Sequence, residues 1–249
     1  MSLLSIRREG QGPPFVWLHG FTQTRNSARP FRSILAGSYE LWTLDLPGHG
    51  DAASDTSSLN EIADAVARVL PHEPLALGGY SFGARVAMHV ALRHGNQLNR
   101  LVLLGGSRGL LNPTERDQRR QRDEHLAARL ELIGTTKFLE EWLAQPLFTT
   151  LSLDEVERAA RSSDAAGLAS SLRHAGTGTQ NWLGDVLGDV ECPTLALSGS
   201  RDSKFAREAE AIARAVRHGT YDLIADAGHA AHVERPERTA ARIAKFLGS

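Results

Sequence analysis

The stretch Leu75-Ala76-Leu77-Gly78-Gly79-Tyr80-Ser81-Phe82-Gly83-Ala84-Arg85-Val86-Ala87-Met88 decides the fold. Its centre is a Gly-x-Ser-x-Gly motif that follows a short apolar run and leads into a helical pattern. A serine between a strand and a helix lies on a sharp turn that lifts its hydroxyl above the sheet. The glycines leave room where the strand and the helix come close. We therefore predict a nucleophile or base at Ser81; the alternative is a tight glycine turn with an incidental serine.

Short apolar runs alternate with helical patterns along much of the remaining chain. The runs cover residues 15–18, 41–44, 75–77, 101–104 and 194–197, with a weaker one at 221–224. Runs this short and continuous suit strands that are buried on both faces. Helical patterns lie between them, at residues 59–70, 84–94, 206–216 and 236–247. This alternation predicts an α/β fold with a mostly parallel central sheet that is flanked by helices.

Residues 107–189 interrupt the alternation, because they contain no convincing strand pattern. Helices are expected there at residues 114–133, 136–144, 153–160 and 168–174. A helical block between the strands of a parallel sheet is typical of a lid over the functional site. We expect residues 1–106 and 190–249 to form the core and residues 107–189 to form an inserted helical lid.

The composition argues against several classes of function. A chain of 249 residues with 41% hydrophobic and 23% charged residues is typical of a globular protein with a full core. A net charge of −1 gives no reason to expect nucleic acid or an anionic membrane as a partner. No apolar run is long enough to span a bilayer, and residues 1–8 lack the core of a signal peptide. Cys192, the only cysteine, cannot form an internal disulfide, so we expect a structural thiol in a cytoplasmic protein.

Ser81 needs a base, and the base needs an orienting group, because a serine hydroxyl is nearly inert at neutral pH. Asp202 follows an expected strand, at the edge where open α/β sheets place their sites; the alternative is a carboxylate that only caps a helix. His229 lies in the loop after the last expected strand, within reach of both other groups, and His232 in the same loop is the alternative base. We predict a catalytic triad of Ser81, Asp202 and His229.

The sequence Trp17-Leu18-His19-Gly20-Phe21 follows the first expected strand. In this type of fold, an N–H group of this early loop and that of the residue after the serine point at a developing oxyanion. These groups belong to Phe21 and Phe82, while His19 would brace the loop. No Cys/His cluster or His-Glu-x-x-His motif indicates a metal site, and we expect no metal and no cofactor.

These elements, in the chain order Ser, Asp, His, resemble the α/β-hydrolase superfamily over essentially the whole chain. The segment Asp45-Leu46-Pro47-Gly48-His49-Gly50 resembles the D-x-P-G-x-G turn that is common there. Four finer features are similar to one family, the 2-succinyl-6-hydroxy-2,4-cyclohexadiene-1-carboxylate synthases of menaquinone biosynthesis. They are Arg85 one helical turn after the serine, the string Arg201-Asp202-Ser203-Lys204-Phe205, the string Trp142-Leu143-Ala144-Gln145-Pro146-Leu147-Phe148, and Ser107-Arg108-Gly109-Leu110 followed by an Arg-rich helix. Phe82 and Ala84 depart from the Leu and Gly expected in that family, without removing a catalytic group.

The resemblance implies a lyase that eliminates pyruvate from 2-succinyl-5-enolpyruvyl-6-hydroxy-3-cyclohexene-1-carboxylate, with the triad acting as a base. That small-molecule substrate carries three carboxylates, which guanidinium groups bind in a two-pronged geometry. The substrate-binding residues that the resemblance implies are Tyr80, Arg85, Arg119, Trp142 and Arg161, with Arg120 or Arg122 as alternatives to Arg119. Lid arginines can instead be solvated partners of nearby carboxylates, and Trp142 can be lid packing.

Two other functions stay open at this point. One is a serine hydrolase, either an esterase or a carbon–carbon bond hydrolase, that acts on an acidic small molecule. The other is a binding module that kept the fold and lost catalysis. The presence of all three triad residues disfavours the binding module, because a receptor does not need them.

Overall fold

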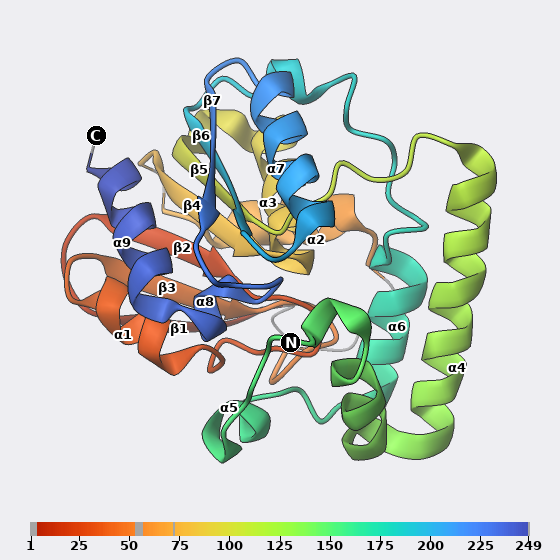
Figure 1. The fold of residues 1–249 in the computed structure, drawn as a ribbon. Helices are drawn as coiled ribbons and strands as arrows, with labels where there is room; N and C mark the ends of the chain where they lie inside the picture. Colours follow the sequence, from red (N-terminus) through yellow and green to blue (C-terminus); the bar gives the residue numbers. More distant parts are fainter. Residues whose placement is uncertain (1–3, 53–56, 72, 249) are drawn as a thin grey trace.

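The computed structural model describes residues 4–52, 57–71 and 73–248. In this part of the chain, a seven-stranded sheet has the order β1-β3-β2-β4-β5-β6-β7 (Figure 1). β1 pairs antiparallel with β3 at one edge, and the other neighbouring strands pair in parallel. The expected α/β fold with a mostly parallel sheet is therefore confirmed. The strands are β1 (Ser5–Glu9), β2 (Pro14–Leu18), β3 (Glu40–Asp45), β4 (Leu75–Tyr80), β5 (Leu98–Leu104), β6 (Thr194–Gly199) and β7 (Gly219–Ile224).

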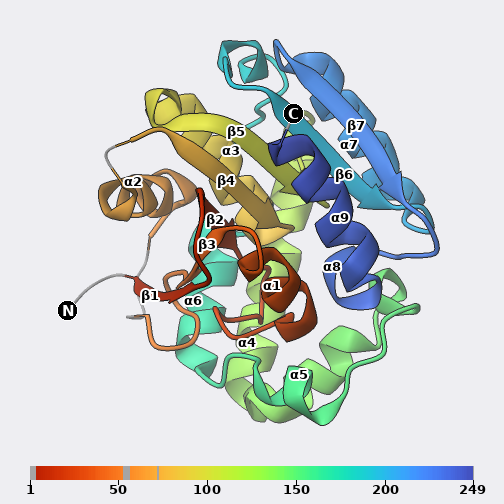
Figure 2. The same ribbon diagram turned by 90° about the vertical axis from the view of Figure 1, so that its left-hand side faces the viewer.

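Helices cover both faces of this sheet. α1, α8 and α9 pack on one face, and Figure 2 shows them in front of the strands. α2, α3 and α7 pack on the other face. Because both faces are covered, successive residues of β2 are buried in opposite clusters: Phe15 and Trp17 on one side, Val16 and Leu18 on the other. These helices are α1 (Arg29–Ala36), α2 (Leu59–Val69), α3 (Phe82–His94), α7 (Ser203–Ala215), α8 (Ala231–Glu234) and α9 (Pro236–Leu247).

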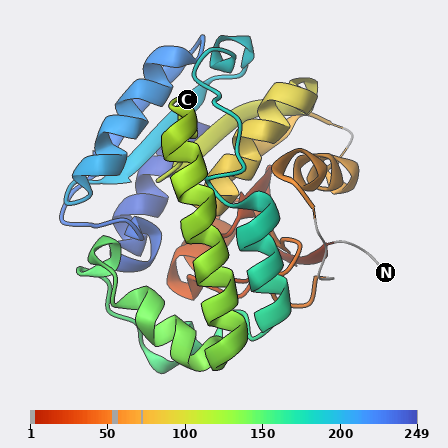
Figure 3. The ribbon, with the colours of Figure 1, turned by 90° about the vertical axis from the view of Figure 1, so that its right-hand side faces the viewer.

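Residues 107–189, which connect β5 to β6, form helices and turns without a strand. α4 and α6 lie side by side (Figure 3) and bury a cluster that includes Leu130, Phe138 and Leu172. Gly134, with φ 74°, interrupts the helical geometry of α4, which agrees with the break expected between residues 133 and 136. The role of this segment as a lid stays a prediction. Its elements are α4 (Pro113–Leu143), η2 (Pro146–Phe148), α5 (Glu155–Ala159), α6 (Ala165–Ala175) and η3 (Leu187–Asp189), and a further short turn, η1 (Gly95–Gln97), precedes β5.

The composition led us to expect no membrane span and a structural role for Cys192. None of the helices within residues 4–52, 57–71 and 73–248 combines the length and apolar character needed to cross a bilayer. Cys192 is buried, and burial raises the pKa of its thiol, which is typical of a structural cysteine. Residues 1–3 of the N-terminal segment discussed above lie outside the described residues.

The glycines of the serine motif lie where α3 approaches β2 and β4. A Cβ atom added at Gly83 would collide with the backbone carbonyl of Leu18, and one added at Gly79 would collide with the backbone of Gly83. Because backbone atoms cannot move aside as a flexible side chain does, we predict that Gly83→Ala lowers the free energy of unfolding by about 1–3 kcal/mol. Urea unfolding followed by circular dichroism measures this change.

Gly95 offers a matched control at the other end of α3. It has helical geometry, with φ −59°, and an added Cβ would meet nothing within 4 Å. Gly95→Ala should therefore leave stability unchanged or raise it by up to about 1 kcal/mol, because alanine restricts the unfolded chain. Equal unfolding free energies for the two variants would show that close packing does not explain the glycine at position 83.

Candidate active site

Ser81 lies in the sharp turn between β4 and α3. Its backbone has φ 50° and ψ −102°, an unusual conformation for a residue other than glycine. The Ser81 N–H donates to the carbonyl of Leu104 at 2.8 Å, and the Ser81 carbonyl accepts from the N–H of Arg85 at 3.1 Å. The turn is thus held by β5 on one side and by the first turn of α3 on the other.

The structure brings the three predicted triad residues together. His229 Nε2 lies 3.1 Å from Ser81 Oγ, and His229 Nδ1 lies 2.8 Å from Asp202 Oδ2. His229 and Asp202 are both buried. In the tautomer whose Nδ1–H donates to Asp202, Nε2 carries the lone pair that can accept the serine proton. The arrangement has the geometry of a nucleophile or base with its activating imidazole and carboxylate.

Asp202 makes contacts that fit both of the roles that the sequence left open. Its Oδ1 accepts from the N–H of Phe205 at 3.2 Å and so caps α7, while its Oδ2 faces His229. The ring of Phe205 packs against that of His229 with centroids 4.3 Å apart. The cap therefore fixes the carboxylate, and the phenyl ring limits the movement of the imidazole.

His232, the alternative base, is directed elsewhere. Its Nε2 lies 3.2 Å from Gln23 Nε2, and its ring packs against Tyr80 with centroids 4.3 Å apart. Burial lowers the pKa of His232 to about 3, so the ring is neutral at physiological pH. The contacts of His232 make it part of the support beneath the site rather than the partner of Ser81.

Phe21 and Phe82, the predicted oxyanion donors, both line the same cavity as Ser81. Phe82 is the first residue of α3, where helix geometry leaves the N–H without an intrahelical acceptor. The loop that holds Phe21 is closed by a hydrogen bond of 2.9 Å from the Gly20 N–H to Gln23 Oε1. Their role as oxyanion donors stays a prediction.

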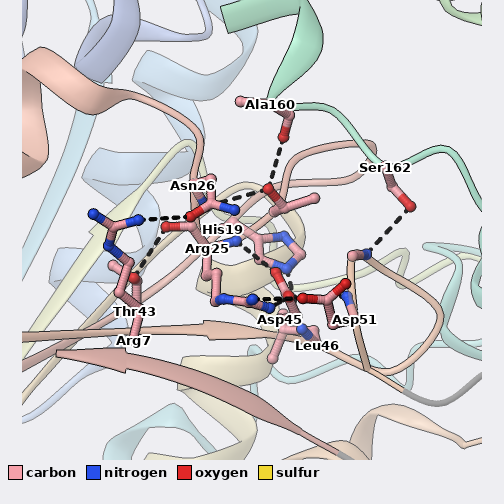
Figure 4. Close-up of polar contacts among 12 residues, drawn as sticks. Arg7, His19, Arg25, Asn26, Thr43, Asp45, Leu46, Asp51, Ala160 and Ser162 are labelled. Atoms are coloured by element: carbon pink, nitrogen blue, oxygen red, sulfur yellow. Dashed lines mark hydrogen bonds and ion pairs between the residues drawn. The ribbon is translucent and has the colours of Figure 1, made fainter.

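A polar network braces the loop that carries Phe21 (Figure 4). His19 accepts from the N–H of Leu46 at 3.1 Å through Nε2, and burial lowers the pKa of His19 to about 4, so one ring nitrogen remains an acceptor. Asp45 accepts from the backbone N–H groups of Arg25 at 2.6 Å and Asp51 at 3.0 Å, and it also pairs with the Arg25 guanidinium. The D-x-P-G-x-G turn after β3 thus anchors the loop after β2.

A cavity of about 660 Å³ opens over Ser81 and His229, between the core and residues 107–189. Its lining is strongly cationic: Asp202 is the one carboxylate among the described residues that line it. An environment with this balance of charge favours an anionic ligand. The cationic lining residues are Arg85, Arg119, Arg122, Arg161, Arg201 and Lys204.

Arg85 is a buried cation whose hydrogen bonds go to neutral acceptors. Its Nη1 donates to the carbonyl of Ala175 at 2.9 Å and to Gln180 Oε1 at 3.4 Å. Burial, assisted by the nearby charge of Arg119, lowers the pKa of Arg85 to about 9. A carboxylate in the cavity would compensate this charge, which makes Arg85 a strong candidate for anion binding.

Arg161 is a second buried cation with incomplete pairing. Its Nη1 donates to Thr22 Oγ1 at 2.9 Å, but its Nη2 lies 3.7 Å from Glu157 Oε1, and its Nε has no hydrogen-bond partner among the described residues. Burial lowers the pKa of Arg161 and raises that of Glu157. Arg161 is therefore an incompletely paired cation among the residues that line the cavity.

The remaining predicted lid arginine and its alternatives lie in different places. Arg119 lines the cavity and donates from Nε to Asp123 Oδ1 at 2.8 Å, so its charge is already partly compensated. Arg122 also lines the cavity, whereas Arg120 is exposed and pairs with Asp117. Of the two alternatives to Arg119, the structure thus places only Arg122 at the cavity.

Two aromatic residues predicted to bind substrate also line the cavity. Tyr80 packs against His229 with ring centroids 5.2 Å apart, and Trp142 packs edge-on against Phe21 at 5.0 Å. Burial raises the pKa of Tyr80, so its phenol remains protonated. Trp142 also stacks on Phe138 with ring centroids 6.0 Å apart, which fits the packing role given above as the alternative; its role in substrate binding stays a prediction.

The sequence missed other lining residues, among them Phe148, Arg201 and Lys204. All three belong to the two strings, 142–148 and 201–205, on which the resemblance rests. The sequence therefore marked these segments, but it did not assign a binding role to each residue in them. As for metals, no group of three or more His, Cys, Asp or Glu side chains in the described part of the chain is arranged to hold an ion.

The chain is similar to known proteins over nearly its whole length. The model of the alpha/beta hydrolase family matches residues 15–242. The 2-succinyl-6-hydroxy-2,4-cyclohexadiene-1-carboxylate synthase of Yersinia pseudotuberculosis is 31% identical over 252 residues, which cover 98% of this chain and 90% of the relative. The synthase of the same name from Photorhabdus laumondii is 31% identical over 258 residues, which cover 99% of this chain and 90% of the relative.

Solved structures give a similar result. MenH from S. aureus superposes with a TM-score of 0.90 at 28% sequence identity, covering 100% of this chain and 98% of that one. A malate-bound thermophilic esterase from Thermogutta terrifontis superposes with a TM-score of 0.82 at 25% sequence identity, and the match covers 98% of this chain and 93% of the esterase.

Proposed function

Because the chain belongs to the alpha/beta hydrolase family, and within it to the family of the 2-succinyl-6-hydroxy-2,4-cyclohexadiene-1-carboxylate synthases, we propose that it is a carbon–oxygen lyase of menaquinone biosynthesis. It eliminates pyruvate from 2-succinyl-5-enolpyruvyl-6-hydroxy-3-cyclohexene-1-carboxylate. The observation that carries this proposal is the cationic cavity directly above the hydrogen-bonded set of Ser81, His229 and Asp202. A substrate with three carboxylates matches that charge.

In the proposed mechanism Ser81 acts as a base. As Oγ removes the ring proton next to the succinyl ketone, His229 Nε2 takes up the hydroxyl proton, and Asp202 stabilises the resulting imidazolium. Negative charge develops on the conjugated oxygen, and the N–H groups of Phe21 and Phe82 stabilise it. The carbon–oxygen bond to the enolpyruvyl group then breaks, and the released enolpyruvate takes up a proton to give pyruvate. Acid–base groups suffice for this step, so the proposal includes no cofactor.

Residues 107–189 act in this proposal as a lid that completes the binding site. Arg119, Trp142 and Arg161 come from this segment, whereas Tyr80 and Arg85 come from the core. The guanidinium groups hold the carboxylates, and the protonated phenol of Tyr80 is available as a hydrogen-bond donor. A cytoplasmic location for this reaction remains part of the proposal.

A coupled pyruvate assay on the freshly generated enolpyruvyl compound tests the proposal. Since this compound decays on its own, each measurement needs a parallel reaction without protein. We expect pyruvate release to depend on protein concentration. Pyruvate formation no faster than in the protein-free reaction would refute the synthase activity.

A serine hydrolase acting on an acidic small molecule is the alternative. The same hydrogen-bonded set supports nucleophilic attack by Ser81, and the esterase from Thermogutta terrifontis, which shares the fold, has malate bound. Rapid turnover of p-nitrophenyl esters, together with an acyl group trapped on Ser81 and detected by mass spectrometry, would favour this alternative. The proposed elimination forms no acyl-enzyme.

A further inference from the structure

Thr22, which follows Phe21 in the loop after β2, has an unusual backbone. Its φ is 68°, in the left-handed region that β-branched residues rarely adopt, and its side chain is buried. A residue keeps such a conformation only where its surroundings hold it. The contacts of Thr22 therefore show which residues hold this loop in its conformation.

Two hydrogen bonds from the segment 160–162, which lies between α5 and α6, hold Thr22. Its Oγ1 accepts from Arg161 Nη1 at 2.9 Å, and its carbonyl accepts from the Ser162 N–H at 2.8 Å. The Ala160 carbonyl accepts from the hydroxyl of Thr24 at 2.7 Å, so neighbouring residues of the same loop meet this segment as well. Figure 4 shows the Ala160 carbonyl in this hydrogen bond, and it shows the Ser162 hydroxyl accepting from the N–H of Gly50, in the turn after β3. The loop after β2 is tied to segment 160–162 along its length.

Thr22 thus joins two parts of the site. On one side lies Arg161, a buried and incompletely paired cation that lines the cavity. On the other side lies Phe21, the candidate oxyanion donor. We infer that Thr22 is a positioning residue, whose hydroxyl holds the Arg161 guanidinium in place for a substrate carboxylate and couples carboxylate binding to the placement of the Phe21 N–H. This inference rests on the proposed function.

A double-mutant cycle tests the inference. Valine keeps the shape and the β-branched backbone preference of threonine but lacks the hydroxyl, so Thr22→Val removes the hydrogen bond alone. We expect it to lower kcat/KM for pyruvate release by about 10-fold, the usual scale for one hydrogen bond to a charged group. Thr22→Ser should recover most of this loss. In an Arg161→Met background, Thr22→Val should change kcat/KM by less than about twofold, because its partner is already absent.

Succinate binding, measured by calorimetry on the same proteins, provides a second cycle that does not need the reaction. Thr22→Val should weaken succinate binding where Arg161 is present and leave it unchanged where Arg161 is methionine. Equal effects of Thr22→Val in both backgrounds would show a merely structural role and overturn the inference, as would failure of the unsubstituted protein to bind succinate. Absence of pyruvate release with an intact succinate cycle would instead refute the proposed function alone.

Discussion

Ser81→Ala should lower kcat for pyruvate release by about 100-fold or more, the usual contribution of a positioned base. The reason is geometric, since Ser81 Oγ is the atom that lies 3.1 Å from His229 Nε2, and alanine leaves nothing in its place. KM should change little, because the cationic groups that hold the carboxylates are untouched. The coupled pyruvate assay measures the rate, and thermal unfolding followed by circular dichroism verifies the fold.

Ser198 is a suitable control for this variant. It is a buried serine on β6, and its Oγ donates to the carbonyl of Gly199 at 3.3 Å, away from the lining of the cavity. Ser198→Ala should therefore keep the rate of the unsubstituted protein. If the kcat of Ser81→Ala were more than a tenth of the kcat of the unsubstituted protein, the base in this reaction would have to be another group.

The meeting of Ser81, Asp202 and His229 could be anticipated from sequence. Ser81 and Asp202 each follow a strand whose apolar pattern is plain, His229 follows the weaker run of β7, and the carboxyl ends of these parallel strands share one edge of the sheet. The sequence does not predict the edge strand β1, because its residues are mostly exposed and form no buried apolar run. The strand is instead defined by its hydrogen bonds to β3. α1 was missed because Ala28 precedes it without a side-chain cap.

Pairing between side chains was the part that sequence could not supply. Whether Arg119 or Arg120 reaches the cavity depends on the rotation of α4 against α6, which long-range packing sets. The residues around Thr22 in the sequence do not predict its conformation, because its hydrogen-bond partner Arg161 lies 139 residues away. Sequence likewise does not show that the hydrogen bonds of Arg85 lack a carboxylate, because its acceptors in Ala175 and Gln180 lie 90 and 95 residues away.

Arg85→Met should raise KM for the enolpyruvyl substrate by about 10- to 100-fold, as expected for losing a charged hydrogen-bond partner. The fold should survive, because replacing a buried charge by an apolar side chain of similar size is often neutral for stability. Steady-state kinetics and thermal unfolding measure the two effects. Arg120→Met is the matched control, since Arg120 is exposed and pairs with Asp117, and its KM should be unchanged. Unfolding of Arg85→Met would identify a structural arginine instead.

The pH dependence of KM gives Arg85 a signature that no general loss of structure reproduces. Since burial lowers its pKa to about 9, Arg85 of the free protein is charged below that pH and loses its charge as the pH rises through it. A carboxylate binds the charged form, so KM of the unsubstituted protein should be flat near neutrality and rise above about pH 9. In Arg85→Met this rise should disappear, because the titrating group is gone. A rise of equal size in both proteins would assign the titration to another group and remove Arg85 from the anion site.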